Sequence, residues 1–153
     1  PGAFVKKVVL RADWIETPMG AMVAVASHTA LHLLEFPERK ALPAELAALR
    51  KDAKGALGFG RFGPTEQIER EMADFMGGVS AEFATPLRPL GTPFTQDVWR
   101  ALREIPAGEA RSYIAVARAM GRPDATRAVA RANGANPIPL PSPATACWAR
   151  TGA

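Results

Sequence analysis

The last third of this 153-residue chain carries a regular succession of helix start and stop signals. Thr92 followed by Pro93 provides a capping side chain and then a proline at the first helical position, where proline is favoured. Ser112 is a second capping residue and predicts a short helix over 113–120 that Gly121 ends. Because these signals follow one another so closely, this part of the chain is restricted to short helices joined by tight turns.

A third helix is predicted directly after this turn. Pro123 opens it, and it runs to Asn133, where Gly134 closes it. Arg127 and Arg131 fall one helical turn apart, and therefore on one face. Two helices joined by a short turn, the second with basic residues on one face, are typical of a helix-turn-helix, although helix pairs of this kind occur widely.

The first 90 residues have a mixed pattern of strands and helices and no visible catalytic cluster. They predict, in chain order, a strand–turn–strand over 5–27, a strand over 30–36, a helix over 44–51, a glycine-rich loop over 54–64 and a helix after Thr65 that ends at Gly77. His28 and His32 lie four residues apart in apolar sequence and are expected on one face of a strand. Without a carboxylate or thiol partner, two such imidazoles are structural more often than they are metal ligands.

The net charge of +4 comes entirely from the second part of the chain. Residues 1–92 hold 11 Lys and Arg against 11 Asp and Glu, whereas residues 93–153 hold 8 arginines against 4 acidic residues. Arginine is preferred for bidentate contacts with phosphates and bases. The excess therefore indicates a nucleic-acid partner, with a solvated arginine-rich surface as the alternative.

The composition excludes several classes of protein. Hydrophobic residues make up 48% of the chain, which excludes disorder for most of it, and no apolar run approaches the ~20 residues of a membrane helix. Cys147 is the only cysteine, so an internal disulfide and a multi-cysteine zinc site are excluded and a reducing, cytoplasmic location is expected. We expect no metal, no cofactor and no membrane association. Because the first residue is Pro1 rather than methionine, we interpret the chain as a fragment or a processed piece.

Five sequence blocks follow one another at fixed intervals and go beyond helix patterning. They are Gly91–Thr95, Val98–Trp99, Ile105–Glu109, Ser112–Tyr113 and Arg127–Asn136. Together they resemble the O6-alkylguanine-DNA alkyltransferases, most closely the methyltransferase half of bacterial Ada-type proteins. The resemblance covers residues 91–140 closely and extends more loosely over 13–34.

The resemblance implies a fold, a reaction and a partner. The fold is α/β (α+β), with an N-terminal mixed sheet and helix domain of the ribonuclease H-like type over 1–90. A winged helix-turn-helix-like domain for DNA binding and alkyl transfer follows over 91–153. Such proteins bind double-stranded DNA containing O6-alkylguanine, flip the damaged base and transfer its alkyl group to a cysteine thiolate in a single turnover. By resemblance we expect a monomeric methylated-DNA–protein-cysteine S-methyltransferase that repairs DNA without a cofactor.

The family motifs also assign roles to five residues of this chain. Tyr113 matches the phenol at the base pocket, which can donate a hydrogen bond to the departing guanine. Arg127 matches the residue that enters the duplex in place of the flipped base, and Asn136 matches the turn residue that orients the nucleophile loop. Thr95 and Arg122 fall where the family touches the DNA backbone. Each of these residues, taken alone, can be explained by a structural role. Only their combined spacing indicates a function.

The segment that should carry the acceptor cysteine departs from the family pattern. Pro143 aligns with the proline of the family string Pro-Cys-His-Arg-Val, but residues 144–146 read Ala-Thr-Ala. The acceptor is therefore absent at the position of Ala144, and we expect a domain that is altered and truncated after about residue 140. Cys147 lies three residues late without a neighbouring histidine, and a displacement of even about 1 Å lowers a rate on the order of 10²-fold.

Three hypotheses compete to explain this departure. Reading the codons two bases late from Ser142 permits Pro-Cys-His-Arg-Val-Leu-Gly, so a frameshift near residues 140–142 is favoured. The second is a relative that has exchanged its cysteine and binds alkylated DNA without transfer. The third is that Cys147 acts as a displaced acceptor, which its position disfavours. We therefore predict a chain without transfer activity. The alternatives are a non-catalytic alkylated-DNA-binding protein, a helix-turn-helix transcriptional regulator and a decayed fragment without function.

Overall fold

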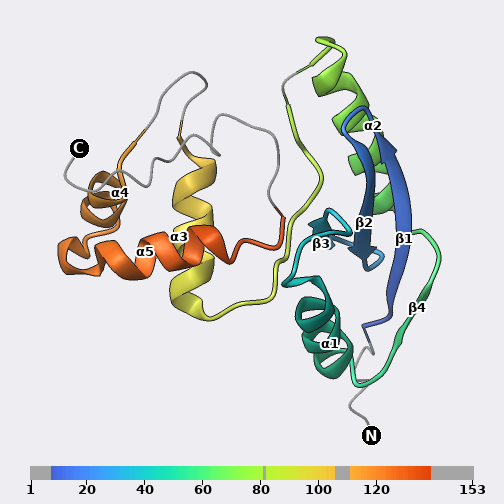
Figure 1. Ribbon diagram of the computed structural model, residues 1–153, viewed down its shortest axis with the longest axis horizontal. Coiled ribbons are helices and arrows are strands. Elements are labelled where there is room, and N and C mark those ends of the chain that lie inside the picture. Colours follow the sequence, from blue (N-terminus) through green and yellow to red (C-terminus); the bar gives the residue numbers. More distant parts are fainter. Residues whose placement is uncertain (1–7, 81, 106–110, 139–153) are drawn as a thin grey trace, which may run out of the picture. The chain divides into compact units, whose positions relative to one another are not determined.

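The computed structural model describes residues 8–80, 82–105 and 111–138. The chain divides into two compact units, an N-terminal unit, Pro1–Leu90, and a C-terminal unit, Gly91–Ala153 (Figure 1). Each unit has a hydrophobic cluster of its own. Among the described residues, no helix is long and apolar enough to cross a lipid bilayer.

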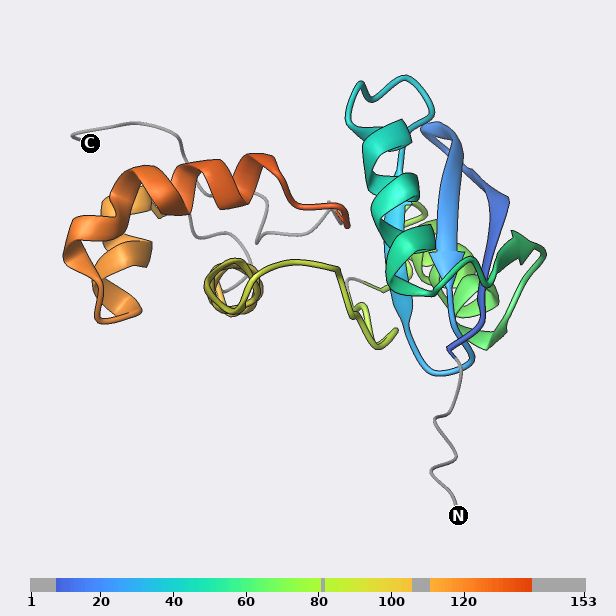
Figure 2. The ribbon, with the colours of Figure 1, turned by 90° about the horizontal axis from the view of Figure 1, so that it is seen from below.

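The described residues of the N-terminal unit form a four-stranded sheet with two helices (Figures 1 and 2). The elements, in chain order, are β1 (Leu10–Thr17), β2 (Gly20–Ala26), β3 (Leu31–Glu35), α1 (Leu42–Asp52), β4 (Leu57–Phe59) and α2 (Gly63–Met76). The strand order is β3-β2-β1-β4, in which only the pairing of β1 with β4 is parallel. The sheet is therefore mixed, as the resemblance implies.

One face of the sheet is buried under α1. Leu10 of β1, Val25 of β2 and Leu33 of β3 form a hydrophobic cluster with two α1 residues, Leu42 and Leu49. Val25 pairs with Leu33 of β3 and with Ala12 of β1, and Leu10 lies two residues before Ala12. Because successive side chains of a strand alternate between faces, the three residues share one face.

The other face is covered by α2. Ile15 of β1, which has the opposite parity to the residues under α1, is fully buried. Ile68 and Met72 of α2, the helix that contacts β1 and β2, lie one helical turn apart and are fully buried as well. Burial of both faces explains why the apolar run of β2 is nearly continuous rather than alternating with polar residues.

Two predictions for this unit are wrong in part. The segment 54–64, predicted as a loop, contains β4, which is only three residues long and pairs with a strand distant in sequence. The helix predicted after Thr65 begins at Gly63. Thr65 therefore lies inside α2, where its Oγ1 accepts a hydrogen bond from the backbone N–H of Phe62 at 3.3 Å and supports the first turn.

The described part of the C-terminal unit is helical. It contains α3 (Pro93–Arg103), α4 (Tyr113–Ala119), a 3₁₀ helix η1 (Pro123–Ala125) and α5 (Thr126–Gly134). Both predicted caps are confirmed. Thr92 Oγ1 accepts a hydrogen bond from Thr95 N at 3.2 Å at the start of α3, and Ser112 Oγ accepts one from Ala115 N at 3.1 Å at the start of α4.

The third predicted helix is divided into two parts. Pro123 starts η1, and α5 follows from Thr126. Gly134 is the last residue of α5 rather than the residue after it. The part of the predicted winged domain that follows Ile138 lies outside the described residues.

The three α-helices of this unit pack around one core. Its buried side chains are Val98, Trp99, Leu102, Ile105, Tyr113, Val116, Ala117, Val129 and Ala132. Trp99 also joins α3 to α5, because its indole Nε1 donates a hydrogen bond to the carbonyl of Ala132 at 2.7 Å. A buried indole N–H needs such a partner, and this bond helps to fix the position of α5 against α3.

Candidate nucleic-acid interface

A tight turn joins α4 to α5. Gly121 has a φ of +72°, a left-handed conformation that glycine adopts without steric cost and that ends α4. The backbone N–H of Arg122 then donates to the carbonyl of Ala117 at 2.9 Å, which closes the end of the helix. Two helices held in this way by a short turn form the arrangement that a helix-turn-helix requires.

The exposed side of α5 is basic. Arg127 and Arg131 are exposed and lie one helical turn apart, whereas Val129 and Ala132 are buried in the core. Among the residues that the structure describes, neither guanidinium forms an ion pair with a carboxylate. This side of α5 therefore presents two positive charges to the solvent.

Tyr113 lies in the core at the start of α4. Its side chain is 9% exposed, and its hydroxyl oxygen accepts a hydrogen bond from Asn133 Nδ2 at 3.2 Å. This bond ties the first turn of α4 to the last turn of α5. The sequence prediction does not single out Asn133, because its contact with Tyr113 spans 20 residues.

Asn136 bends the chain after α5. Its Oδ1 accepts a hydrogen bond from the backbone N–H of Ile138 at 3.0 Å, which forms a turn of the kind that asparagine favours. The segment that Asn136 is predicted to orient follows this turn. That segment, with Pro143, Ala144 and Cys147, lies outside the described residues.

Thr95 lies in the first turn of α3. Its Oγ1 donates a hydrogen bond to the carbonyl of Thr92 at 2.9 Å. Gly91 packs closely against this turn, since a Cβ there would lie 2.5 Å from Thr95 Oγ1 and 2.6 Å from Trp99 Cη2. A glycine is therefore required at position 91, and the first turn of α3 is held firmly where the resemblance predicts contact with the DNA backbone.

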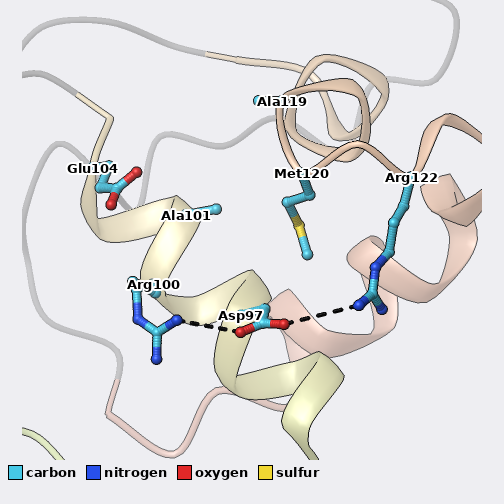
Figure 3. Close-up of a pocket in the computed structure, with 7 residues that line it drawn as sticks. All are labelled: Asp97, Arg100, Ala101, Glu104, Ala119, Met120 and Arg122. Atoms are coloured by element: carbon cyan, nitrogen blue, oxygen red, sulfur yellow. Dashed lines mark hydrogen bonds and ion pairs between the residues drawn. The ribbon is translucent and has the colours of Figure 1, made fainter.

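Arg122 is held against α3 by two groups. Its Nη2 lies 4.0 Å from Asp97 Oδ2, and its guanidinium carbon lies 5.2 Å from the centre of the Phe94 ring. Asp97 Oδ1 also accepts a hydrogen bond from Arg100 Nη1 at 3.2 Å. Asp97, Arg100 and Arg122 line an open pocket of about 230 Å³, together with Ala101, Glu104, Ala119 and Met120 (Figure 3).

The five predicted site residues do not form one contact network. Thr95 lies in α3, Tyr113 starts α4, Arg122 lies in the turn, Arg127 lies in α5 and Asn136 follows α5. Within the described parts of the chain, no hydrogen bond or ion pair joins any two of them. The residues are thus distributed over a surface and the core beneath it rather than gathered in a compact catalytic cluster.

The two histidines have structural partners. Contrary to the sequence prediction, they do not share a strand face, because His28 lies in the turn before β3 and packs at a tilt against Phe62, with ring centres 3.9 Å apart. His32 Nε2 lies 3.1 Å from Ser27 Oγ, and burial, with a smaller contribution from Arg88, lowers the pKa of His32. No group of three or more His, Cys, Asp or Glu residues in the described ranges could hold a metal ion.

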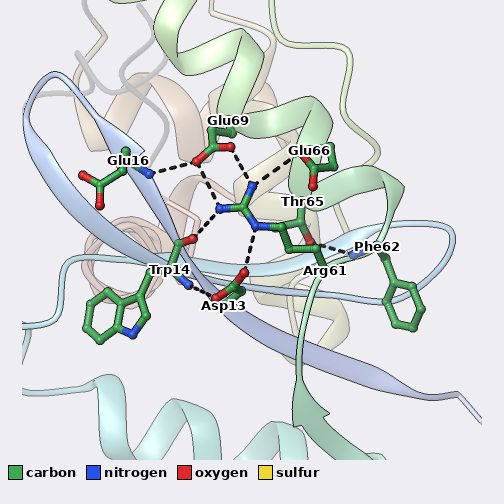
Figure 4. A network of polar contacts seen from close by, with 8 residues as sticks. All are labelled: Asp13, Trp14, Glu16, Arg61, Phe62, Thr65, Glu66 and Glu69. Carbon is green, nitrogen blue, oxygen red and sulfur yellow. Dashed lines mark hydrogen bonds and ion pairs between the residues drawn. The ribbon is translucent and has the colours of Figure 1, made fainter.

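Arg61 is the centre of a polar network in the N-terminal unit (Figure 4). Its Nε donates to Asp13 Oδ2 of β1 at 2.8 Å, and its Nη1 donates to Glu69 Oε1 of α2 at 2.6 Å. Its Nη2 donates to the carbonyl of Trp14 at 2.7 Å, and Glu69 Oε2 accepts the backbone N–H of Glu16 at 2.9 Å. These bonds fix α2 to the central strand of the sheet.

Arg61 lowers the pKa of both of these carboxyl groups. For Asp13, the hydrogen bond from Arg61 is the main cause and the bond from Trp14 N adds to it. For Glu69, the hydrogen bond from Arg61 outweighs burial, which acts in the opposite direction. Because both groups are ionised and paired at neutral pH, the network is structural rather than a candidate general acid or base.

Glu35 is a buried carboxyl group beside α1. Its side chain is 1% exposed, and Arg39 Nε lies 2.9 Å from its Oε2. Burial, followed by the hydrogen bond with Glu45 and the charge of that residue, raises the pKa of Glu35 to about 8. Glu35 Oε2 and Glu45 Oε1 are buried and find no well-aligned donor among the described residues. The raised pKa of Glu35 favours its protonated form, which can donate a hydrogen bond to Glu45.

Comparison with known proteins extends the evidence for the C-terminal unit. A family model for the DNA-binding domain of 6-O-methylguanine DNA methyltransferase matches residues 93–150. The constitutive methylated-DNA–protein-cysteine methyltransferase of Bacillus subtilis is 43% identical over 74 residues, which are 48% of this chain and 45% of that protein. The alignment with that relative thus spans less than half of its length.

Longer matches include both units. The methylated-DNA–protein-cysteine methyltransferase of Methanosarcina barkeri is 34% identical over 131 residues, which cover 84% of this chain and 75% of that protein. The crystal structure of Mycobacterium tuberculosis OGT in complex with DNA matches with a TM-score of 0.70 and 30% identity, over 92% of this chain and 78% of that one. The mixed sheet and the helical unit thus agree in fold and in sequence with this group, and the chain belongs to the methylated-DNA–protein-cysteine methyltransferase family.

Proposed function

We propose that this chain binds double-stranded DNA containing O6-alkylguanine through its C-terminal unit, as a DNA-repair protein of its family. The observation that carries the proposal is the exposed basic side of α5, where Arg127 and Arg131 follow the tight turn at Gly121. A helix presented by such a turn can enter a groove of duplex DNA, and guanidinium groups bind phosphates and stack on bases. The fold shared with a protein crystallised with DNA supports the proposal.

The roles of the individual residues follow the family motifs. Arg127 is the side chain that fills the space of the flipped base, and its exposed position on α5 suits that task. Thr95 and Arg122 bind the DNA backbone. Tyr113 lies at the base pocket, where its hydroxyl group, which now accepts a hydrogen bond, donates one to guanine, and Asn136 orients the segment that follows. We further propose that the chain acts as a monomer in the cytoplasm, without a metal or cofactor.

The family reaction is the transfer of the alkyl group to a protein cysteine, and we propose that this chain lacks it. The position of the acceptor is occupied by Ala144, and alanine has no nucleophile. Cys147 has no histidine beside it to remove its proton. A frameshift near residues 140–142 remains our explanation for the altered segment.

The direct test is a transfer assay with duplex DNA that carries O6-methylguanine with a radiolabelled methyl group. We expect no label on the protein after prolonged incubation with excess DNA. Stoichiometric labelling would contradict the proposal, and loss of that label in Cys147→Ser would then identify Cys147 as the acceptor. Determining the nucleotide sequence that encodes residues 140–153 tests the frameshift, since only a shifted frame can encode the family string.

Replacing Arg127 with alanine tests the base-flipping role. Because Arg127 is predicted to fill the space of the flipped base, Arg127→Ala should weaken binding to the O6-methylguanine duplex by about tenfold. Binding to the undamaged duplex should change much less. Fluorescence anisotropy with the two duplexes at one salt concentration measures both constants.

Arg118→Ala is the matched control for this change. Arg118 is an exposed arginine of α4, so its removal changes the net charge by the same amount. If Arg118→Ala and Arg127→Ala weaken both duplexes equally, the arginines contribute general electrostatics only and the flipping role is wrong. Tight binding to an undamaged operator sequence would instead favour a transcriptional regulator.

A further inference from the structure

Arg122 is exposed, yet its guanidinium group has two contacts on α3. Its side chain is 52% exposed, and it is contributed by the turn between α4 and α5. Asp97 Oδ2 lies 4.0 Å from Nη2 (Figure 3). The guanidinium carbon lies over the Phe94 ring, 5.2 Å from its centre. One contact is thus ionic and the other is a cation–π contact.

Asp97 is shared between two arginines. Its Oδ1 accepts the hydrogen bond from Arg100 at 3.2 Å, while Oδ2 faces Arg122 at the longer distance. One carboxylate therefore partly neutralises two guanidinium groups, and the contact with Arg100 is the closer one. Arg122 has the weaker hold on Asp97 and is the easier of the two to detach.

A DNA phosphate offers Arg122 the same chemistry as Asp97 does. Carboxylates and phosphates both bind a guanidinium through charge-assisted hydrogen bonds. The open pocket beside Asp97, with the short side chains of Ala101 and Ala119 in its lining, leaves room for Arg122 to move. The Phe94 contact does not depend on Asp97, so the side chain stays partly ordered when the ion pair opens.

We infer that Asp97 is a positioning residue that holds Arg122 against α3 in the free protein and competes with DNA phosphate for it. The inference rests on the proposed binding of Arg122 to the DNA backbone. The arginines strengthen binding to DNA, whereas the carboxylate of Asp97 on α3 weakens binding to any duplex. Phosphate must displace Asp97 before Arg122 contributes its full charge.

The test measures binding of a fluorescein-labelled, undamaged 16-base-pair duplex by anisotropy over a range of salt concentrations. Asp97→Asn should bind about threefold to fivefold more tightly than the unchanged chain, in line with the strength of an exposed ion pair. Asp97→Glu, which retains the charge, should restore the original affinity. Glu104→Gln is the matched control, because Glu104 lines the same pocket, and it should change the affinity by much less.

The double variant with Arg122→Ala separates the inference from a general charge effect. If Asp97 acts through Arg122, Asp97→Asn has almost no effect once Arg122 is removed. An equal gain in affinity with and without Arg122, or no gain from Asp97→Asn in the unchanged chain, overturns the inference. Circular dichroism of each variant checks that the helices are retained.

The Arg122→Ala single variant tests the underlying proposal separately. Loss of one phosphate contact should lower the slope of log affinity against log salt by about 0.9. If the slope does not change, Arg122 does not bind phosphate, and both the proposed contact and the competition by Asp97 are wrong. If the slope falls but Asp97→Asn has no effect, only the inference about Asp97 is wrong.

Discussion

Replacing Arg61 with alanine should lower the free energy of unfolding of the N-terminal unit by about 1 to 2 kcal/mol, because three partly exposed acceptors that Arg61 now bonds lose their partner. Asp13, Glu69 and the carbonyl of Trp14 all accept hydrogen bonds from its guanidinium group. Without Arg61, the carboxylates of Asp13 and Glu69 would also repel each other. Urea unfolding followed by circular dichroism and by tryptophan fluorescence measures the loss.

Two further variants define the cause of this loss. Arg61→Lys should recover only a minor part of the stability, because one ammonium group cannot replace a planar fork that bonds three acceptors. Arg70→Ala removes an exposed arginine from α2, the helix that follows Arg61, and should change the stability by little. An equal effect of Arg61→Ala and Arg70→Ala would show that the network contributes no more than a surface charge.

The effect of Arg61→Ala should depend on pH. The pKa values of Asp13 and Glu69 are lowered in the folded protein from their ordinary values of 3.8 and 4.5. Their contribution to stability is therefore present above pH 4.5 and is lost as the pH falls through the lowered values. The difference in the free energy of unfolding between the unchanged chain and Arg61→Ala should accordingly become smaller as the pH falls below 4.5.

Glu35→Gln should stabilise the protein, and the gain should increase with pH. The pKa of Glu35 is raised from 4.5 to about 8, so between these values the unfolded chain releases a proton that the folded chain retains. Stability from this group is complete below pH 4.5 and declines as the pH rises through the window. Glutamine has no such proton, so the variant should become progressively more stable than the unchanged chain as the pH rises from 4.5 to about 8.

Urea unfolding of the unchanged chain and of Glu35→Gln at pH 5, 6, 7 and 8 tests this prediction. The difference between their free energies of unfolding does not contain the contribution of His32, because His32 titrates in both proteins. Glu38→Gln is the control, because Glu38 is exposed on the loop after β3. A constant difference across the pH range would mean that Glu35 is ionised in the folded protein and fully compensated by Arg39.

Local signals in the sequence correctly predict the starts of α3 and α4. The hydroxyl groups of Thr92 and Ser112 accept backbone hydrogen bonds within the first turn, so the cap depends on residues only three positions apart. The short strand β4 was missed because three residues show no periodicity and its partner β1 is distant in sequence. The start of α2 was misplaced because Thr65 bonds Phe62 N from inside the helix rather than from before it.

At the candidate site, too, local features could be predicted from the sequence, whereas contacts between distant residues could not. The basic face of α5 follows from the spacing of Arg127 and Arg131, and the structure exposes both. The partners of the other residues could not be predicted, because the contact between Asn133 and Tyr113 and that between Asp97 and Arg122 depend on how three helices pack. Helical periodicity identifies a face but does not identify what another helix places against it.

The hydrogen bond from Trp99 to the carbonyl of Ala132 has a consequence for how this family can change. It holds α5 by its backbone and from the inner side, so the outward residues of that helix take no part in anchoring it. If Arg127 and Arg131 bind DNA as proposed, mutations there would alter which lesions or DNA sequences are recognised while the scaffold stays intact. The outward side chains of α5 can therefore change during evolution without loss of the packing that holds the helix in place.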